Sequence, residues 1–301
     1  MSRPRAVASA VALAVVVASS SALACAVCAA GDPTLEAMGS EKSFEGRVRA
    51  ALAYRIGEAW TGERGVDAIL VDEQRLDLQA VYAPWRDVAF SLDMPLLYRR
   101  IGADHAGHVD YVAPGDLEAR ARYTAWTSSG AGVRQALAFH AGIKAPTAPL
   151  ERDPMGELLP PDLEAGCSSI TPLGGASYVL SSSPLTFVAA ATVYFPFPVR
   201  SDAPHSGDSL RTQTSLQVQP RYWIAGRLGF DTKLEEPGTL PPNDAVAPNS
   251  GGFVGYVASE IEIVPRADWL VTAGGFFPVI QALRGHHGEG PVLSITVALD
   301  F

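Results

Sequence analysis

The chain has 301 residues, a formal net charge of −9 and a charged-residue content of 18%. A chain of this length buries a sizeable core without disulfide staples, and its low charge content excludes a disordered acidic protein. The acidic balance argues against a nucleic-acid-binding protein, which needs a basic face. The 3 cysteines are too few for a dense disulfide framework.

Residues 1–24 have the pattern of a secretory signal peptide. Arg3 and Arg5 precede an apolar run from residue 6 to residue 17, and Ala22-Leu23-Ala24 matches the small-residue cleavage site. Cleavage there leaves Cys25 as the first mature residue and removes two positive charges, so the net charge changes from −9 to −11. Export implies an oxidising compartment.

Two other interpretations of this segment stay open. The apolar run could be a transmembrane anchor, although it is shorter than the ~20 residues of a spanning helix and no charged flank follows it. Cys25 could be lipidated, although Leu23 lies two residues before it rather than the preferred three. In either case we expect residues 25–43 to form a short N-terminal periplasmic segment and residues 44–301 to form the folded domain.

From residue 44 onward, apolar and polar residues alternate with a period of two, which is typical of β-strands. In the first run, Leu52, Tyr54 and Ile56 share one face, and Arg47 and Arg49 lie on the other. Similar runs cover 73–84, 88–99, 116–126, 133–144, 174–182, 186–197, 209–223, 224–233, 253–263, 268–281 and 291–301. The sequence therefore predicts twelve strands.

The connections between these runs alternate in length. Short ones are expected at 84–87, 127–132, 183–185, 222–225 and 265–268, and long ones at 57–72, 100–115, 145–173, 198–208, 234–252 and 282–290. Outer-membrane barrels have an even number of strands, short periplasmic turns and longer extracellular loops, and closure removes the sheet edges that lipid cannot accommodate.

The sequence therefore predicts an all-β protein, a closed antiparallel transmembrane β-barrel of about twelve strands in the outer membrane of a Gram-negative bacterium, surrounded by its lipid. A secreted soluble β-sandwich is the competing fold. The C-terminus favours the barrel, because apolar residues alternate up to a terminal Phe301. Such a strand resembles the signal read by the barrel assembly machinery. The tryptophans near strand ends fit interfacial girdles: Trp60, Trp85, Trp126, Trp223 and Trp269.

The middle of the chain resembles the outer-membrane transporter family of the phenol-degradation meta-pathway. The residues that carry the resemblance are Gly142-Ile143-Lys144-Ala145-Pro146-Thr147, an acidic loop that closes on Leu163-Glu164-Ala165-Gly166, and Gly174-Gly175-Ala176-Ser177-Tyr178. That family typically shows a G-x-K-x-P-T strand end, an L-x-P-G-T-G-S-like turn and a G-x-x-Y strand. Here Ala165-Gly166-Cys167-Ser168-Ser169 replaces the Gly-Thr-Gly-Ser part. The resemblance implies a monomeric barrel for small apolar molecules.

The polar residues of the alternating runs are predicted to face the barrel interior. The predicted lumen-lining residues are Arg47, Arg49, Arg75, Arg120, Arg122, Arg134, His140, Lys144, Arg211, Arg221, Glu260 and Glu262. A charged interior suits a solvated lumen, and its surplus of arginines predicts a preference for anionic solutes. The alternative is a network of ion pairs that fills and rigidifies the barrel.

No motif indicates an enzyme, a cofactor or a metal site. The histidines of the predicted outer loops lack the rigid spacing of a zinc site, so we interpret them as solvated residues: His105, His108, His205, His286 and His287. Cys25 and Cys28 form a C-x-x-C that no His follows, which argues against haem attachment. We expect no bond between Cys25 and Cys167, because the topology places them on opposite sides of the membrane.

Enzymatic barrels exist, but this chain has no G-x-S-x-G elbow and no Gly-rich phosphate loop. His140 is therefore interpreted as a polar residue of the lumen. The predicted function is a passive transporter or channel for small molecules, hydrophobic or aromatic ones among them. A non-conducting barrel with a structural or surface-binding role is the alternative. No nucleic-acid partner is expected.

Overall fold

The computed structural model describes residues 45–301 apart from residues 64, 167 and 242. The predicted signal peptide, the segment 25–43 and the three cysteines lie outside the described residues. The described part contains no helix that is long and apolar enough to cross a membrane.

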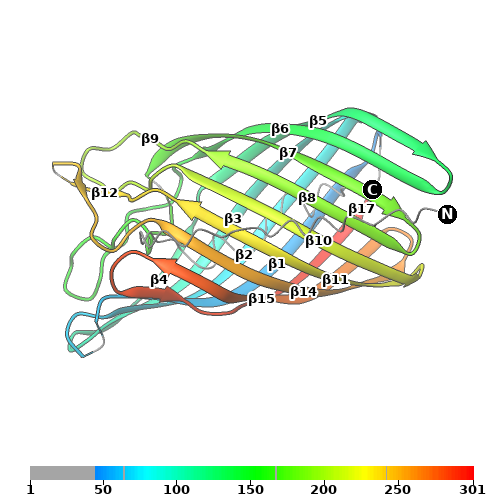
Figure 1. The fold of residues 1–301 in the computed structure, drawn as a ribbon. Coiled ribbons are helices and arrows are strands. Elements are labelled where there is room, and N and C mark those ends of the chain that lie inside the picture. Colours follow the sequence, from blue (N-terminus) through cyan, green and yellow to red (C-terminus); the bar gives the residue numbers. More distant parts are fainter. Residues whose placement is uncertain (1–44, 64, 167, 242) are drawn as a thin grey trace, which may run out of the picture.

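Twelve long strands form one closed antiparallel sheet (Figure 1). The strands are β1 (Val48–Thr61), β2 (Ile69–Trp85), β3 (Val88–Ala103), β5 (Leu117–Gly130), β6 (Val133–Ala145), β7 (Ser169–Ser182), β8 (Leu185–Tyr194), β10 (Ser209–Arg221), β11 (Ile224–Glu235), β14 (Gly252–Arg266), β15 (Trp269–Leu283) and β17 (Val292–Asp300). The first strand pairs with the second and with the last, which closes the barrel. The predicted fold class is confirmed.

Short turns join the long strands at one end of the barrel, where the C-terminus also lies, and longer connections join them at the other (Figure 1). Five short strands belong to the longer connections: β4 (Gly107–Pro114), β9 (Phe197–Pro198), β12 (Thr239–Leu240), β13 (Ala245–Val246) and β16 (His287–Glu289).

The long connection predicted at 100–115 is largely strand, so its prediction as a loop was wrong. The third strand continues to Ala103, and β4 folds back along it over the residue pairs from Leu96↔Pro114 to Ala103↔Gly107. Val109 and Tyr111 of β4 pack against an apolar cluster of the barrel interior. This packing explains why the hairpin of β3 and β4 extends beyond the alternating run that was predicted at 88–99.

The two faces of the sheet differ in polarity, as a membrane-spanning barrel requires. On β1, Leu52, Tyr54 and Ile56 face outward and are 44%, 39% and 38% exposed, while the interleaved Ala53 and Arg55 are buried. In lipid this outward face meets hydrocarbon, and the inward face can carry the polar groups. Apolar outward residues and charged inward residues therefore place the sheet in a bilayer with its polar groups inside.

Aromatic residues surround the short-turn end of the barrel. Trp85, Trp223 and Trp269 are exposed in or next to the short connections, and Trp126 is exposed in the last part of β5. Trp60 lies near the opposite end of β1, where its indole ring packs close to Gly288. Amphipathic rings at this level are typical of the membrane–water interface of barrels.

Candidate functional site

The loop between β6 and β7, described for residues 146–166 and 168, folds into the barrel. Leu159 and Leu163 of this loop are 0% and 1% exposed. They pack in one cluster with inward side chains from both sides of the barrel closure: Ala59, Val71, Ile101, Val254, Tyr256, Ala258, Phe276 and Val292. The loop thus narrows the lumen at its long-loop end, and we call the described residues 146–166 and 168 the inward loop.

Arg99 of β3 fastens the inward loop to the wall. Its guanidinium is 1% exposed and forms ion pairs with Glu73 of β2, at 3.0 Å, and with Glu151 of the loop. It also donates a hydrogen bond to the backbone carbonyl of Leu163. Pairing one buried cation with two buried carboxylates offsets much of the free-energy cost of removing these charges from water.

Besides Glu151, the inward loop carries three buried carboxyl groups: Asp153, Asp162 and Glu164. Burial raises the pKa of Glu164 to about 8, and its side chain accepts a hydrogen bond from the backbone nitrogen of Glu151 at 3.3 Å. Burial, followed by the charge of Glu235, raises the pKa of Asp162 well above its ordinary value. Glu164 is therefore mostly protonated and neutral at neutral pH, and burial shifts Asp162 in the same direction.

Ion pairs fill the wall formed by β1, β2 and β3. Arg55 lies 3.5 Å from Asp77, and Arg75 bonds the same carboxylate and lies 3.7 Å from Asp93. The side chain of Asp77 is completely buried. On this wall each charge is offset by a neighbour, so the network rigidifies the barrel and leaves little net field.

The wall formed by β5 to β11 has a different pattern. Residues paired across these strands run in one line: Arg122 pairs with His140, His140 with Gly175, Gly175 with Thr192, Thr192 with Arg211, and Arg211 with Lys233. Neighbouring strands lie about 4.8 Å apart, so this line follows the barrel wall over six neighbouring strands. We call Arg122, His140, Arg211 and Lys233 the basic row.

Contacts within the basic row hold its side chains in place. The Nε2 atom of His140 lies 2.9 Å from the hydroxyl of Thr192. Gly175 between them leaves room for the imidazole, because a Cβ atom at this position would overlap the ring. The amine of Lys233 pairs with Glu235 two residues along the same strand. Nε of Arg122 is buried and has no hydrogen-bond partner among the described residues.

Tyr194 of β8 supports two arginines. The guanidinium of Arg211 lies 4.6 Å from its ring centroid and that of Arg120 lies 5.9 Å from it. Arg120 also donates a hydrogen bond to the hydroxyl of Tyr194 at 2.7 Å and pairs with Glu118. Cation–π contacts of this kind favour charge placed over the ring face.

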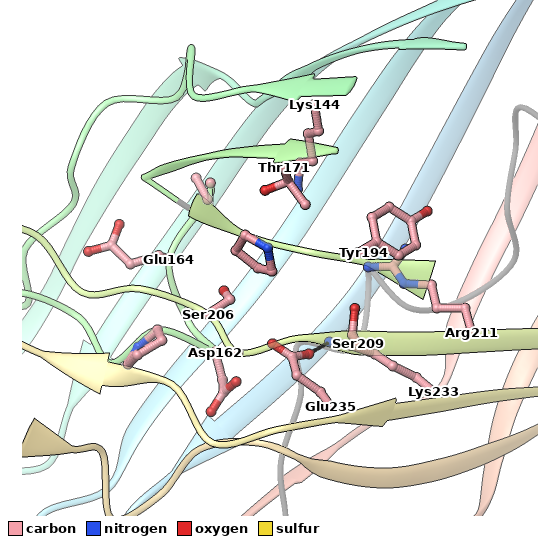
Figure 2. A pocket seen from close by; sticks show the side chains of 15 residues that line it. Lys144, Asp162, Glu164, Thr171, Tyr194, Ser206, Ser209, Arg211, Lys233 and Glu235 are labelled. Carbon is pink, nitrogen blue, oxygen red and sulfur yellow. Dashed lines mark ion pairs between the residues drawn. The ribbon is translucent and has the colours of Figure 1, made fainter. Parts of the chain in front are cut away.

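A cavity of about 60 Å³ lies between the inward loop and this wall. Figure 2 shows Arg211, Tyr194 and Lys233 on one side and Asp162 and Glu235 close to one another. Lys144 and Glu164 also line the cavity. Hydroxyl and apolar groups lie between the charged residues: Thr171, Ser206, Ser209, Pro161, Pro196 and Ala165. The cavity has room for a few waters, and it offers cationic donors beside an aromatic ring.

The structure distributes the predicted lumen residues over several groups. Arg49 is paired with Asp300 at 2.6 Å, Lys144 lies 3.6 Å from Asp116, and Glu260 and Glu262 are both partners of Arg227. The structure brings Arg122, His140 and Arg211 together in the basic row. Three others are exposed at the short-turn end of the barrel: Arg47, Arg134 and Arg221.

The inward loop is the part of the site that sequence reasoning missed. Its acidic, proline-containing sequence is typical of an exposed surface loop. The loop nevertheless contains the apolar residues Leu158, Leu159 and Leu163. These leucines could have indicated that part of the loop is buried. Among the described residues, no group of three or more His, Cys, Asp or Glu side chains is arranged to hold a metal ion.

No family model and no curated protein sequence matches the chain. Among solved structures, an outer membrane channel from Pseudomonas putida F1 is similar, with a TM-score of 0.61 and 14% identity over 87% of this chain and 98% of that one. The CymD monoaromatic hydrocarbon channel aligns with a TM-score of 0.43 and 10% identity, over 86% of this chain and 89% of that one.

The translocator domain of the autotransporter NalP from Neisseria meningitidis aligns with a TM-score of 0.47 and 10% identity, over 89% of this chain and 94% of that one. The likeness to the Pseudomonas putida channel confirms the fold that the family resemblance implied. This chain has the fold of an outer-membrane β-barrel.

Proposed function

We propose that the protein is an outer-membrane channel through which small molecules diffuse passively, without a cofactor and without catalysis. The observation that carries the proposal is the polar wall of β5 to β11, which faces a cavity beside the inward loop. The named function of the similar Pseudomonas putida structure, an outer membrane channel, supports the same conclusion.

The lining of the cavity suits molecules that have both polar and apolar parts. Tyr194, Pro161 and Pro196 offer apolar surface, and Thr171 and Ser209 offer hydroxyl groups. Hydrophobic or aromatic solutes, which the family resemblance implies, would meet the ring of Tyr194 there. The inward loop limits the size of a solute that passes.

We further propose that Phe301 is read by the barrel assembly machinery during insertion. Its side chain is 71% exposed at the short-turn end, and its backbone exchanges hydrogen bonds with Val48 of the first strand, at 2.8 and 3.2 Å. The residue therefore lies at the seam where β1 and β17 close the barrel. An exposed terminal ring at that seam is accessible to a partner in the periplasm.

Liposome swelling tests the channel function. Vesicles that contain the folded protein should swell in isotonic solutions of small neutral sugars, and the rate should fall as the sugar becomes larger. Vesicles without protein give the background rate. Swelling at the background rate for every sugar, together with the absence of current in planar bilayers, would support the non-conducting alternative instead.

A further inference from the structure

We propose that the inward loop is a pH-sensitive gate, which stays docked against the barrel wall in acid and is released in alkali, so that the channel widens as the pH rises. This inference rests on the proposed channel function and names a regulation of it. The loop is placed to act as a gate because Leu159 and Leu163 pack into the interior cluster and narrow the lumen. The charge of its buried carboxyl groups decides whether it stays docked.

The first of these carboxyl groups is Glu164, which lies near Arg99. Glu73 of β2 and Glu151 of the loop are buried there as well, and Arg99 forms its ion pairs with these two. Glu164 accepts a hydrogen bond from the backbone nitrogen of Glu151. Its Oε1 atom is buried and has no hydrogen-bond partner among the described residues. Three buried carboxyl groups therefore lie near one buried guanidinium.

The other cations near Glu164 offset its charge only weakly. Arg152 and Arg200 act on it from exposed positions, where solvent and salt screen their charges, and Arg200 already forms an ion pair at the surface. Lys144 lines the same cavity and lies 3.6 Å from Asp116. Burial therefore dominates and raises the pKa of Glu164 to about 8.

The second carboxyl group, Asp162, faces the wall formed by β11 and β16. Glu235 and Glu289 act on it with charge of the same sign, and Lys233 acts with the opposite sign. The amine of Lys233 is already paired with Glu235. Asp162 accepts a hydrogen bond from the backbone nitrogen of Gly251, while its Oδ2 atom is buried without a partner among the described residues. Burial, followed by the charge of Glu235, raises the pKa of Asp162.

Two further titratable groups lie close to Lys233. His287 of β16 is buried, and burial followed by the charge of Lys233 lowers its pKa to about 3. Its imidazole is therefore neutral and adds no positive charge. Arg211 of β10 lines the cavity and lies over the ring of Tyr194 at 4.6 Å. Lys233 remains the cation that acts most strongly on Asp162.

Docking of the loop is consequently linked to protonation. The pKa of Glu164 is about 8 in the docked loop and 4.5 in its ordinary, solvated state, so the docked state binds the extra proton between these pH values. The ratio of docked to released loop should fall by up to about tenfold for each pH unit in this range. Asp162 shifts in the same direction and adds to the effect. The ion pairs of Arg99 oppose release at every pH and set how far the pH must rise.

Planar-bilayer recordings at about pH 5 and about pH 9 test the gate. In the wild type, the fraction of time in a wider conductance state should rise about tenfold or more between the two conditions. Asp162→Asn and Glu164→Gln, which keep the shape and remove the charge, should each weaken this response, and the double variant should stay narrow at both pH values. Glu157→Gln replaces an exposed carboxyl group of the same loop and, as the matched control, should respond like the wild type.

The distance between two spin labels reports the position of the loop without any current. One label replaces Met155 in the loop and the other replaces Tyr222 in the short turn between β10 and β11, in a cysteine-free background; both residues are exposed. The distance distribution should be narrow at the lower pH and broad at the higher pH. It should stay narrow at both pH values in the double variant.

The two measurements separate the gate from the channel. Identical distances at both pH values, with a current that does not respond to pH, overturn the gate and leave the channel function standing. A pH response that persists in the double variant overturns the roles of Asp162 and Glu164. A distance change without current at either pH supports release of the loop and overturns the channel function. Heat-modifiable migration on gels verifies that each variant has folded.

Discussion

Replacement of Arg99 should release the inward loop. In Arg99→Ala, Glu73 and Glu151 lose their shared cation, and both carboxylates are almost completely buried. Removing one partner of a buried pair costs about 3–5 kcal/mol. That cost falls on the docking of the loop, because the hydrogen bonds that close the barrel do not involve the side chain. At about 1.4 kcal/mol per tenfold change, the ratio of docked to released loop falls by roughly two to four powers of ten.

Arg100→Ala is the matched control at the next position. Arg100 points away from the lumen and pairs with Asp110 at 2.9 Å, where the two side chains are 49% and 41% exposed. An exposed ion pair contributes about 0–1 kcal/mol. This variant should therefore keep the loop docked.

Limited trypsin digestion of the folded protein in detergent provides the assay. Arg152 lies within the inward loop and is itself accessible, so the enzyme should cleave after it much faster in Arg99→Ala than in Arg100→Ala. Single-channel conductance should rise in parallel, because the released loop no longer narrows the lumen. Equal cleavage and equal conductance in the two variants would refute the role assigned to Arg99.

Three further predictions concern the wall, the basic row and the loop. Leu78→Arg, on the outward face at mid-height of β2, should destabilise the barrel in lipid vesicles by about 2–4 kcal/mol in urea titration, whereas Val66→Arg in an exposed loop should have little effect. Gly175→Ala should lower the melting temperature, because the added methyl group overlaps the imidazole ring and a backbone carbonyl; at Gly226 the same exchange meets no neighbour and serves as the control. Glu164 has a folded pKa of about 8 against an ordinary 4.5, so the folded state binds the extra proton and stability should fall as pH rises from about 4.5 to about 8. Glu164→Gln should weaken this pH dependence. A pH profile of the melting temperature that is the same in the variant and the wild type would contradict the argument that burial raises the pKa of Glu164.

The alternation of single residues was enough to predict the barrel, because one face of each strand meets lipid and the other meets the lumen. The local alternation of Leu52, Tyr54 and Ile56 is enough to identify the outward face of β1. The alternation of short and long connections predicted the two ends of the barrel, because outer-membrane barrels have short periplasmic turns and longer extracellular loops. This local pattern does not predict the conformation that a long connection adopts once the barrel has formed.

The inward loop illustrates that limit. Leu159 and Leu163 are buried by contacts with side chains from β1, β2, β3, β14, β15 and β17, and no local pattern encodes contacts so distant in the chain. The basic row is a similar case. Arg122 and Arg211 are recognisable as inward residues, yet their alignment with Lys233 depends on the register of five strand pairs. Register across a closed sheet is a property of the whole barrel.

The central claim is that this sheet presents its apolar face to lipid and its charged face to a lumen. Spin labels placed one at a time along residues 76–81 of β2, in a cysteine-free background reconstituted in vesicles, test it directly. Leu76, Leu78 and Ala80 should be accessible to oxygen and shielded from a water-soluble nickel reagent, while Asp77, Gln79 and Val81 should not show this lipid signature. Equal access of the nickel reagent at all six positions would contradict the account.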